Sequence, residues 1–318
     1  MTNIGVWQSL LNNASQILNL EIEAYCDQLN NKENPRYFHA NVRFPEDSSV
    51  KWRLKVVNPL RTDYTDVQNC NSYNNHIHAR LVKNYLLQSI VDIPAYFSVP
   101  QTHLNCINCS ELVTGDVPSN KDLSLLVDTL IKLRINRGNF LSELAQHNQL
   151  MPHSINFYNR QEYKNRLDFS IKGLLDKELI SAEDASHVVA AFNQNFMVPL
   201  SKDELSFAPG DFSYGNLKVR DGKLVFIDFE HSHIGIGEID LAHLFVNLIA
   251  DGQDDVASTL LCLYEENSMR QALSFDNATF QALVLERVAG KMNSMTNTDG
   301  EKWARLKTLL LSNKVNTA

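Results

Sequence analysis

Residues 209–245 decide the fold and read PGDFSYGNLKVRDGKLVFIDFEHSHIGIGEIDLAHLF. Asp211 lies in a loop after the apolar segment LSFA, Asn216 opens the next strand, and Asp228 lies just beyond the returning strand KLVFI. The Asp-Gly pair at 221–222 is typical of a tight turn, and folding there can bring Asn216 and Asp228 together. An amide oxygen and a carboxylate that converge in this way suit Mg²⁺, which prefers oxygen ligands and adds water and phosphate oxygens.

Asp211 precedes Asn216 by a short loop and would face the same cleft. A phosphoryl-transfer site needs metal ligands that neutralise the developing phosphate charge, and a carboxylate that orients and deprotonates the attacking hydroxyl. Asp and Asn are also favoured in ordinary turns. The prediction of an active site therefore depends on the combination of Asp211, Asn216 and Asp228, not on any one of them.

The part of the chain before this stretch has the pattern of a small β-sheet. Segments 36–44 and 50–57 are rich in aromatic and β-branched residues and flank the turn-forming residues 45–49, which predicts an antiparallel hairpin. Further elements follow from apolar spacing. They are a helix in the first twenty residues, a strand at 21–28, a helix over 74–91 and a strand near 104–113.

Helices dominate after a boundary at Gly115-Asp116-Val117-Pro118. Ser119 and Asp122 resemble a capping box that opens a helix over 120–134. The other expected helices are 160–177, 181–197 and a group from 241 to the end that is interrupted near 251–254 and 293–300, while 205–230 is expected to form strands. The pattern predicts an α+β protein in two lobes with a cleft.

The same stretch, 209–245, resembles the central signature of the aminoglycoside phosphotransferase and choline kinase family. That family has an H-G-D-x-x-x-x-N loop, a hairpin, an I-D-F/W-E element, and a glycine five residues before D-L-A. The matching positions here are Gly210, Asp211, Asn216, Asp228, Glu230, Gly235 and Asp240-Leu241-Ala242. The resemblance implies a protein-kinase-like fold, with a β-rich N-lobe over 1–114 and a larger, mostly helical C-lobe over 115–318.

The resemblance also implies roles for these residues. ATP would be the phosphoryl donor, Asp211 the catalytic base, and Asn216 with Asp228 the ligands of Mg²⁺. Ser213, Glu230 and Asp240 are candidates for contacts to the substrate or for support of the loop. Glu230 would touch substrate or metal, whereas Asp240 would support the catalytic loop by accepting hydrogen bonds.

Upstream, Lys55 in RLKVV resembles the strand lysine that pairs with the donor phosphates in this family, and Lys51 is the competing candidate. The family has a connector whose backbone would bond the adenine edge. The stretch that resembles it here is Ser110, Glu111, Leu112 and Val113. No glycine occurs between Gly5 and Gly115, so a glycine-rich phosphate loop is absent. The expected replacement is the loop 30–34, in which Lys32 would contact phosphate.

Two departures from the family pattern favour an alternative function. Pro209 stands where the family usually has His, and His78 aligns where the family offers a Glu to the strand lysine, unless Asp63, Asp66 or another acid replaces it. The main prediction is an ATP- and Mg²⁺-dependent phosphotransferase that acts on a hydroxyl of a small molecule. The alternative is a catalytically weak pseudokinase or nucleotide-binding regulatory module.

Substrate candidates are choline or ethanolamine, aminoglycosides, macrolides, homoserine and sugar alcohols. The IDFE element followed by DLAHLF leans towards the choline kinase side. Three histidines in the same stretch are interpreted as loop and helix packing rather than as a zinc site. They are His231, His233 and His243.

Composition excludes several classes of protein. The 318 residues are 44% hydrophobic and carry a formal net charge of −8 with scattered Lys and Arg, so no nucleic-acid surface is expected. No apolar run reaches membrane-spanning length, and no signal peptide is recognised. Five cysteines, an odd number, favour reduced thiols in the cytoplasm, with Cys106 and Cys109 as plain strand residues. No pattern specifies an oligomeric state.

Overall fold

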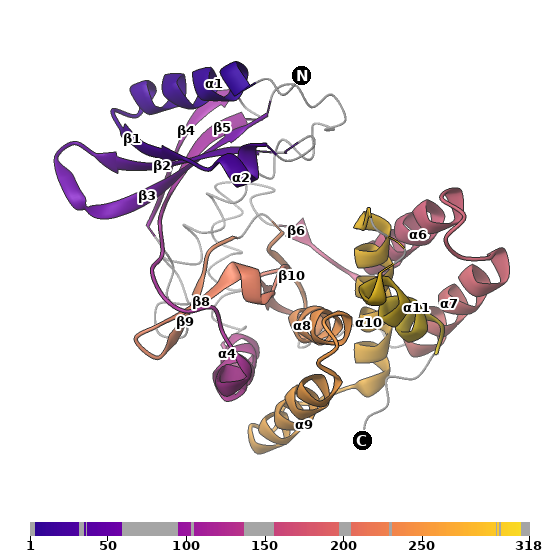
Figure 1. Cartoon of the computed structure of the whole chain (residues 1–318). Coiled ribbons are helices and arrows are strands. Elements are labelled where there is room, and N and C mark those ends of the chain that lie inside the picture. The colour runs from indigo at the N-terminus through magenta and orange to yellow at the C-terminus, as the bar shows by residue number, and fades with distance from the viewer. Residues whose placement is uncertain are drawn as a thin grey trace. The chain divides into compact units, whose positions relative to one another are not determined.

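The computed structural model describes residues 4–31, 35, 37–58, 95–102, 105–136, 156–196, 205–228, 231–296, 298 and 300–312. Contacts within the chain divide it into two compact units, one of 1–116 with 218–231 and one of 117–217 with 232–318. The first unit is built on a β-sheet and the second is larger and mostly helical (Figure 1). The predicted α+β class with a β-rich first part and a helical second part is confirmed.

The first unit contains a five-stranded sheet with the strand order β1-β2-β3-β5-β4. The strands are β1 (Glu21–Tyr25), β2 (Tyr37–Phe44), β3 (Asp47–Val57), β4 (Tyr96–Thr102) and β5 (Asn105–Glu111). Each neighbouring pair is antiparallel, and the β2–β3 hairpin sets His39 opposite Lys55. The predicted hairpin and the strand at 104–113 are confirmed, and the strand predicted over 21–28 is confirmed to Tyr25, because α2 begins at Asp27. β4 was not predicted. Its sequence, YFSVPQT, contains a proline, which weakens the strand pattern.

Helix α1 (Ile4–Ile17) supplies the apolar cover of this sheet, as its helical spacing predicts. Trp7, Leu11 and Ala14 are buried with sheet residues in one hydrophobic core. The sheet members of that core are Phe38, Ala40, Val42, Leu54, Ile107 and Cys109. The short helix α2 (Asp27–Asn30) follows β1. The expected helix over 74–91 lies outside the described residues.

The hairpin of β8 (Leu217–Arg220) and β9 (Lys223–Phe226) turns at Asp221 and Gly222, whose φ angles are 51° and 73°. Both residues are in the left-handed region that this type of turn requires, so the predicted turn is confirmed. Val219 of β8 bridges to Asp116. Residues 218–231 belong to the first unit. The predicted division after residue 114 places them in the C-lobe instead.

The helical unit begins as the capping-box pattern predicts. Ser119 and Asp122 form a reciprocal capping box at the 3₁₀ turn η1 (Asn120–Asp122), and α4 (Leu123–Ile135) follows. Capping boxes at Asn159 and Ser181 likewise open α6 (Arg160–Asp176) and α7 (Ala182–Asn195). Each box satisfies backbone N–H groups that the first helical turn leaves without partners, which fixes where these helices begin.

A three-stranded sheet lies within the helical unit and consists of β6 (Asn156–Phe157), β10 (His233–Ile236) and β7 (Leu205–Ala208), in that order. β10 pairs antiparallel with β7 and sets His233 opposite Ala208. β10 was not predicted, because its four residues include a glycine and are too few for a clear alternating pattern. The end of β7 therefore lies beside the start of β10, and the candidate site follows β7 at Gly210 and Asp211.

Four helices complete the second unit: α8 (Ile239–Ala250), α9 (Asp254–Arg270), α10 (Asn277–Ser294) and α11 (Glu301–Leu311). The interruptions predicted near 251–254 and 293–300 are confirmed, and a further break separates α9 from α10. At that break the side chain of Asp276 caps α10 by accepting from the N–H groups of Ala278 and Thr279. None of the helices in the described part of the chain is long and apolar enough to cross a membrane.

Candidate active site

The loop that carries Asp211 is held between β7 and α8. Gly210 follows β7 with a φ of 84° and donates its backbone N–H to Oδ1 of Asp240 at 3.0 Å. Asp240 lies in the first turn of α8, shortly after β10. β10 runs antiparallel to β7 and sets Ile236 opposite Leu205, so the tie between the start of α8 and the Asp211 loop is the Gly210–Asp240 hydrogen bond.

Asp240 itself is buried, and burial raises the pKa of its carboxyl to about 7. The neighbouring Arg287 and the backbone N–H groups of Gly210 and Phe212 act in the opposite direction and lower this pKa. The carboxyl therefore titrates near neutrality in the folded protein, and in both protonation states it keeps an oxygen that can accept from the loop.

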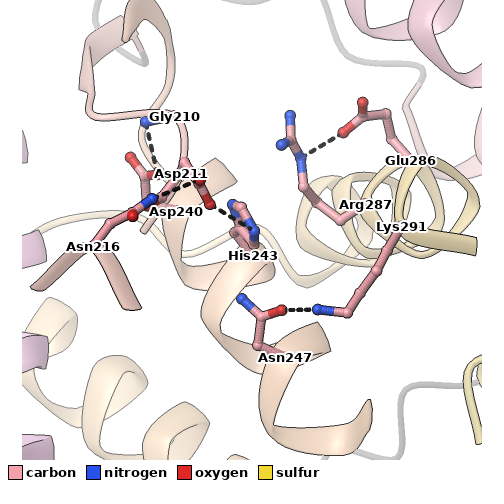
Figure 2. A network of polar contacts seen from close by, with 9 residues as sticks. All are labelled: Gly210, Asp211, Asn216, Asp240, His243, Asn247, Glu286, Arg287 and Lys291. Carbon is pink, nitrogen blue, oxygen red and sulfur yellow. Dashed lines mark hydrogen bonds and ion pairs between the residues drawn. The ribbon is translucent and has the colours of Figure 1, made fainter. Parts of the chain in front are cut away.

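Asn216 is joined directly to Asp211 by its side chain. Its Nδ2 donates to Oδ2 of Asp211 at 2.6 Å and lies 3.3 Å from the Asp211 carbonyl (Figure 2). The backbone closes the same turn, because the N–H of Ser213 donates to the Asp211 carbonyl and the N–H of Asn216 donates to the Ser213 carbonyl, both at 2.9 Å. Asp211 and Asn216 therefore lie at the two ends of one hydrogen-bonded turn.

His243 is a residue of this site whose contact with Asp211 the sequence did not indicate. It lies on α8, one turn after Asp240, and its Nε2 is 3.3 Å from Oδ1 of Asp211 (Figure 2). Burial, then Arg287 and Lys291, hold the pKa of His243 well below its usual value, so the ring is neutral. An ionised carboxylate can only accept, and Nε2 is therefore assigned as the donor. The expectation that His243 serves in helix packing does not include this contact with Asp211.

The first unit contains the other predicted residues, Lys55 and Asp228. Nζ of Lys55 is 3.9 Å from Oδ2 of Asp228 and 4.1 Å from the centre of the Tyr37 ring, so the cation lies between a carboxylate and an aromatic face. Lys51, the competing candidate, is exposed. The geometry favours Lys55 as the lysine that belongs with the Asp228 carboxylate.

The predicted connector begins within the sheet. Ser110 and Glu111 end β5, where Ser110 pairs with Arg53 and Tyr96. The N–H of Leu112 donates to the Lys51 carbonyl at 2.7 Å. Among the hydrogen bonds of the described residues none uses the N–H of Val113.

Glu111 connects this segment to the β8–β9 hairpin. Its carboxylate pairs with Arg220 at 2.9 Å and accepts from the N–H of Ala95 at 3.1 Å. Gly115, with a φ of 140°, lies so close to the hairpin that a Cβ there would stand 2.6 Å from the Val219 carbonyl oxygen. A side chain at 115 would push the connector away from β8, so this glycine is required by a close approach.

Several predicted residues fall outside the described residues, namely Lys32, His78 and Glu230. The predicted Mg²⁺ ligands fit the ion by the chemistry of their donors. Asn216 uses its amide N–H on Asp211 and keeps its Oδ1, while Asp228 supplies a carboxylate; both are the hard oxygen ligands that Mg²⁺ prefers. In the described part of the chain no three His, Cys, Asp or Glu side chains form a metal-binding group. The pairing of Asn216 with Asp228 stays a prediction.

The fold is that of the protein-kinase-like small-molecule kinases, as the sequence resemblance predicts. The aminoglycoside phosphotransferase APH(2″)-IIIa, solved with GDP and kanamycin, is 14% identical, with a TM-score of 0.61 over 98% of this chain and 99% of its own. Amicoumacin kinase hAmiN, solved with AMP-PNP and Ca²⁺, is 12% identical, with a TM-score of 0.57 over 96% and 92%. The ethanolamine kinase of Plasmodium vivax is 15% identical, with a TM-score of 0.54 over 96% and 85%. No protein-family model and no curated sequence matches the chain.

Proposed function

We propose that this protein is a small-molecule kinase, an ATP- and Mg²⁺-dependent phosphotransferase that acts on a hydroxyl group. The observation that carries the proposal is the Asp211–Asn216 pair, closed by a 2.6 Å hydrogen bond on a loop that Asp240 ties to α8. A carboxylate fixed in this way suits a catalytic base, because a base must be held within reach of the proton that it removes.

Asp211 is the base in this proposal. Asn216 holds Oδ2 of Asp211 and His243 lies at Oδ1, so both neighbours orient the carboxylate while it accepts the proton of the attacking hydroxyl. About a third of the Asp211 side chain is exposed, at 34%, which leaves it accessible to a substrate. Ser213, in the same turn, and Glu230 are proposed as substrate contacts or supports.

Residues of the first unit, together with Asn216 of the second, are proposed to bind the nucleotide and the metal. Lys55 would contact the donor phosphates, Asp228 and Asn216 would hold Mg²⁺, and Lys32 would contact phosphate from the loop 30–34. The bound metal would neutralise charge on the phosphate oxygens. Ser110 to Val113 would border the adenine, with the Val113 N–H as the donor. Structures of similar fold contain GDP or AMP-PNP, which supports a purine nucleotide as the donor.

The acceptor in this proposal is a free hydroxyl on a small molecule. The proteins of similar fold include an aminoglycoside phosphotransferase solved with kanamycin and an ethanolamine kinase. A cytoplasmic location is part of the proposal, supported by the free thiols of Cys26, Cys109 and Cys262.

The experiment is an Mg²⁺-dependent nucleotide-consumption screen, run with ATP and with GTP against amino alcohols, aminoglycosides, macrolides, sugars and hydroxy acids. Asp211→Asn is the test variant, and Asp221→Asn is the matched control, because Asp221 is exposed in the β8–β9 turn and Asn tolerates its positive φ. Turnover that Asp211→Asn lowers by at least about 10³-fold and Asp221→Asn leaves unchanged supports the kinase. Nucleotide binding without turnover of any compound would instead favour the nucleotide-binding module.

A further inference from the structure

Beside Asp211, two helices of the second unit direct polar side chains towards each other. His243 and Asn247 lie one turn apart on α8, and Arg287 and Lys291 lie one turn apart on α10 (Figure 2). Positions four residues apart share one face of a helix, so each pair forms a short polar stripe. We call these four residues the α8–α10 donor cluster.

Donors in this cluster outnumber the acceptors that the protein supplies to them. Nη2 of Arg287 and Nδ2 of Asn247 are buried and have no hydrogen-bond partner among the described residues. Nδ1 of His243 is buried without a partner as well and, with Nε2 as the donor, can only accept, so two donors stand against one acceptor. The Arg287 side chain is only 10% exposed. A buried donor without an acceptor is destabilising, so the two donors are unsatisfied unless a ligand or water provides oxygen atoms.

The charge of the cluster is positive. Glu286 lies between two guanidinium groups, pairing with Arg287 at 2.7 Å and with Arg166 at 2.9 Å, so one carboxylate faces two cations. Lys291 Nζ contacts the Asn247 side-chain oxygen, which is uncharged. Burial lowers the pKa of Lys291, while Asp251 and Asp211 act to raise it.

The negative groups that face this cluster offset only part of its charge. Asp240 is coupled to Arg287, but its pKa near 7 leaves it partly neutral at physiological pH. The Asp211 carboxylate lies beside His243, and the proposed reaction requires it as the base. A cationic substrate would add a like charge next to Lys291 and Arg287, whereas an anion would complete the balance.

We propose that the α8–α10 donor cluster binds an anionic oxygen group of the acceptor substrate, a carboxylate or a phosphate monoester, so that the substrate is a hydroxylated anion rather than an amino alcohol. This inference rests on the proposed kinase function, because it places the bound anion next to the base. Arg287 Nη2, Asn247 Nδ2 and Lys291 Nζ supply the hydrogen bonds to its oxygen atoms.

Matched pairs of probes test the inference by isothermal titration calorimetry on the full chain with Mg²⁺ and a non-hydrolysable ATP analogue. The pairs are glycolate with ethanolamine and gluconate with glucosamine, and glycerol 3-phosphate with glycerol separates phosphate from carboxylate recognition. The anion of at least one pair is expected to bind about 10-fold more tightly than its partner, which corresponds to about 1.4 kcal/mol.

Lys291→Gln is expected to remove that preference, and Lys291→Arg to retain it because the charge is kept. Lys172→Gln is the control, since Lys172 is exposed on α6. Equal or tighter binding of the amines, a preference that survives Lys291→Gln, or no binding by any anion at about 10 mM overturns the inference.

The outcome also separates this inference from the proposed function. Asp211-dependent turnover of amino alcohols alone would leave the kinase standing and contradict the anion site. Lys291-dependent binding of hydroxy acids without any phosphate transfer would support the anion site and contradict the proposed kinase function.

Discussion

The two units hold their acidic residues in different ways. In the helical unit Asp211 is fixed by Asn216 at 2.6 Å and by His243 at 3.3 Å, on a loop that Asp240 anchors. In the β unit the Lys55–Asp228 pair is separated by 3.9 Å, which is longer than a hydrogen bond. Asp211, the proposed base, is therefore held by two side chains of its own unit, and Lys55 and Asp228 are expected to draw closer together when phosphates and a metal bind. Substitutions in the two units are expected to change different kinetic constants.

Among the variants compared below, the largest effect is expected for Asp228→Asn, which removes the charge of a proposed Mg²⁺ ligand and keeps the shape of the side chain. Activity should fall by about 10²–10³-fold at physiological Mg²⁺ and recover in part at high Mg²⁺, because the weakened site fills only at higher concentration. The measurement is rate against Mg²⁺ concentration for wild type and variant. An unchanged Mg²⁺ activation constant would remove Asp228 from the metal site.

Lys55→Met and Lys51→Met separate the two candidate strand lysines. Lys55 lies beside Asp228, whereas Lys51 is exposed. Lys55→Met should raise KM for the nucleotide by about 10-fold or more, through loss of a phosphate contact, and Lys51→Met should leave it within about twofold. Steady-state kinetics with varied nucleotide gives both values. A larger effect at Lys51 would reverse the assignment.

His243 lies in the helical unit beside Asp211, the proposed base. Its substitution tests whether the side chains of that unit position the base. His243→Leu removes the donor at Oδ1 of Asp211 and is expected to lower kcat by about 10-fold while KM for the nucleotide stays constant. His243→Gln can still donate and should retain most activity. If both variants keep the wild-type kcat, the contact with Asp211 has no role in positioning the base.

Asp240→Asn gives the smallest effect on activity, because Asn keeps an oxygen for the Gly210 N–H, and it tests stability instead. Burial raises the Asp240 pKa to about 7, above its unfolded value, so the folded state binds more protons between about pH 4 and 7. This contribution to stability is present at acidic pH and is lost as the pH rises through about 7.

Urea unfolding at several pH values measures this effect. The stability of Asp240→Asn relative to wild type should increase by roughly 3–4 kcal/mol from about pH 4 to pH 8. A pH-independent difference between the two proteins would mean that Asp240 is ionised throughout this range.

Much of the local structure could be predicted from sequence because it depends on short-range rules. The capping box of Ser119 and Asp122, the left-handed turn at Asp221 and Gly222, and the closed turn from Asp211 to Asn216 each follow from residues a few positions apart. The strands β4 and β10 were missed, because a proline in one and the glycine and short length of the other hide their pattern.

The α+β class, most helices, and the spacing of Asp211, Asn216 and Asp228 follow from the amino-acid sequence alone. The side chains that surround Asp211 depend on tertiary packing. His243 meets Asp211 because the Gly210–Asp240 hydrogen bond joins the loop to α8, and Lys291 meets Asn247 across 44 residues because α10 packs against α8. Such contacts depend on the long-range packing of buried faces, which leaves no fixed spacing in the sequence.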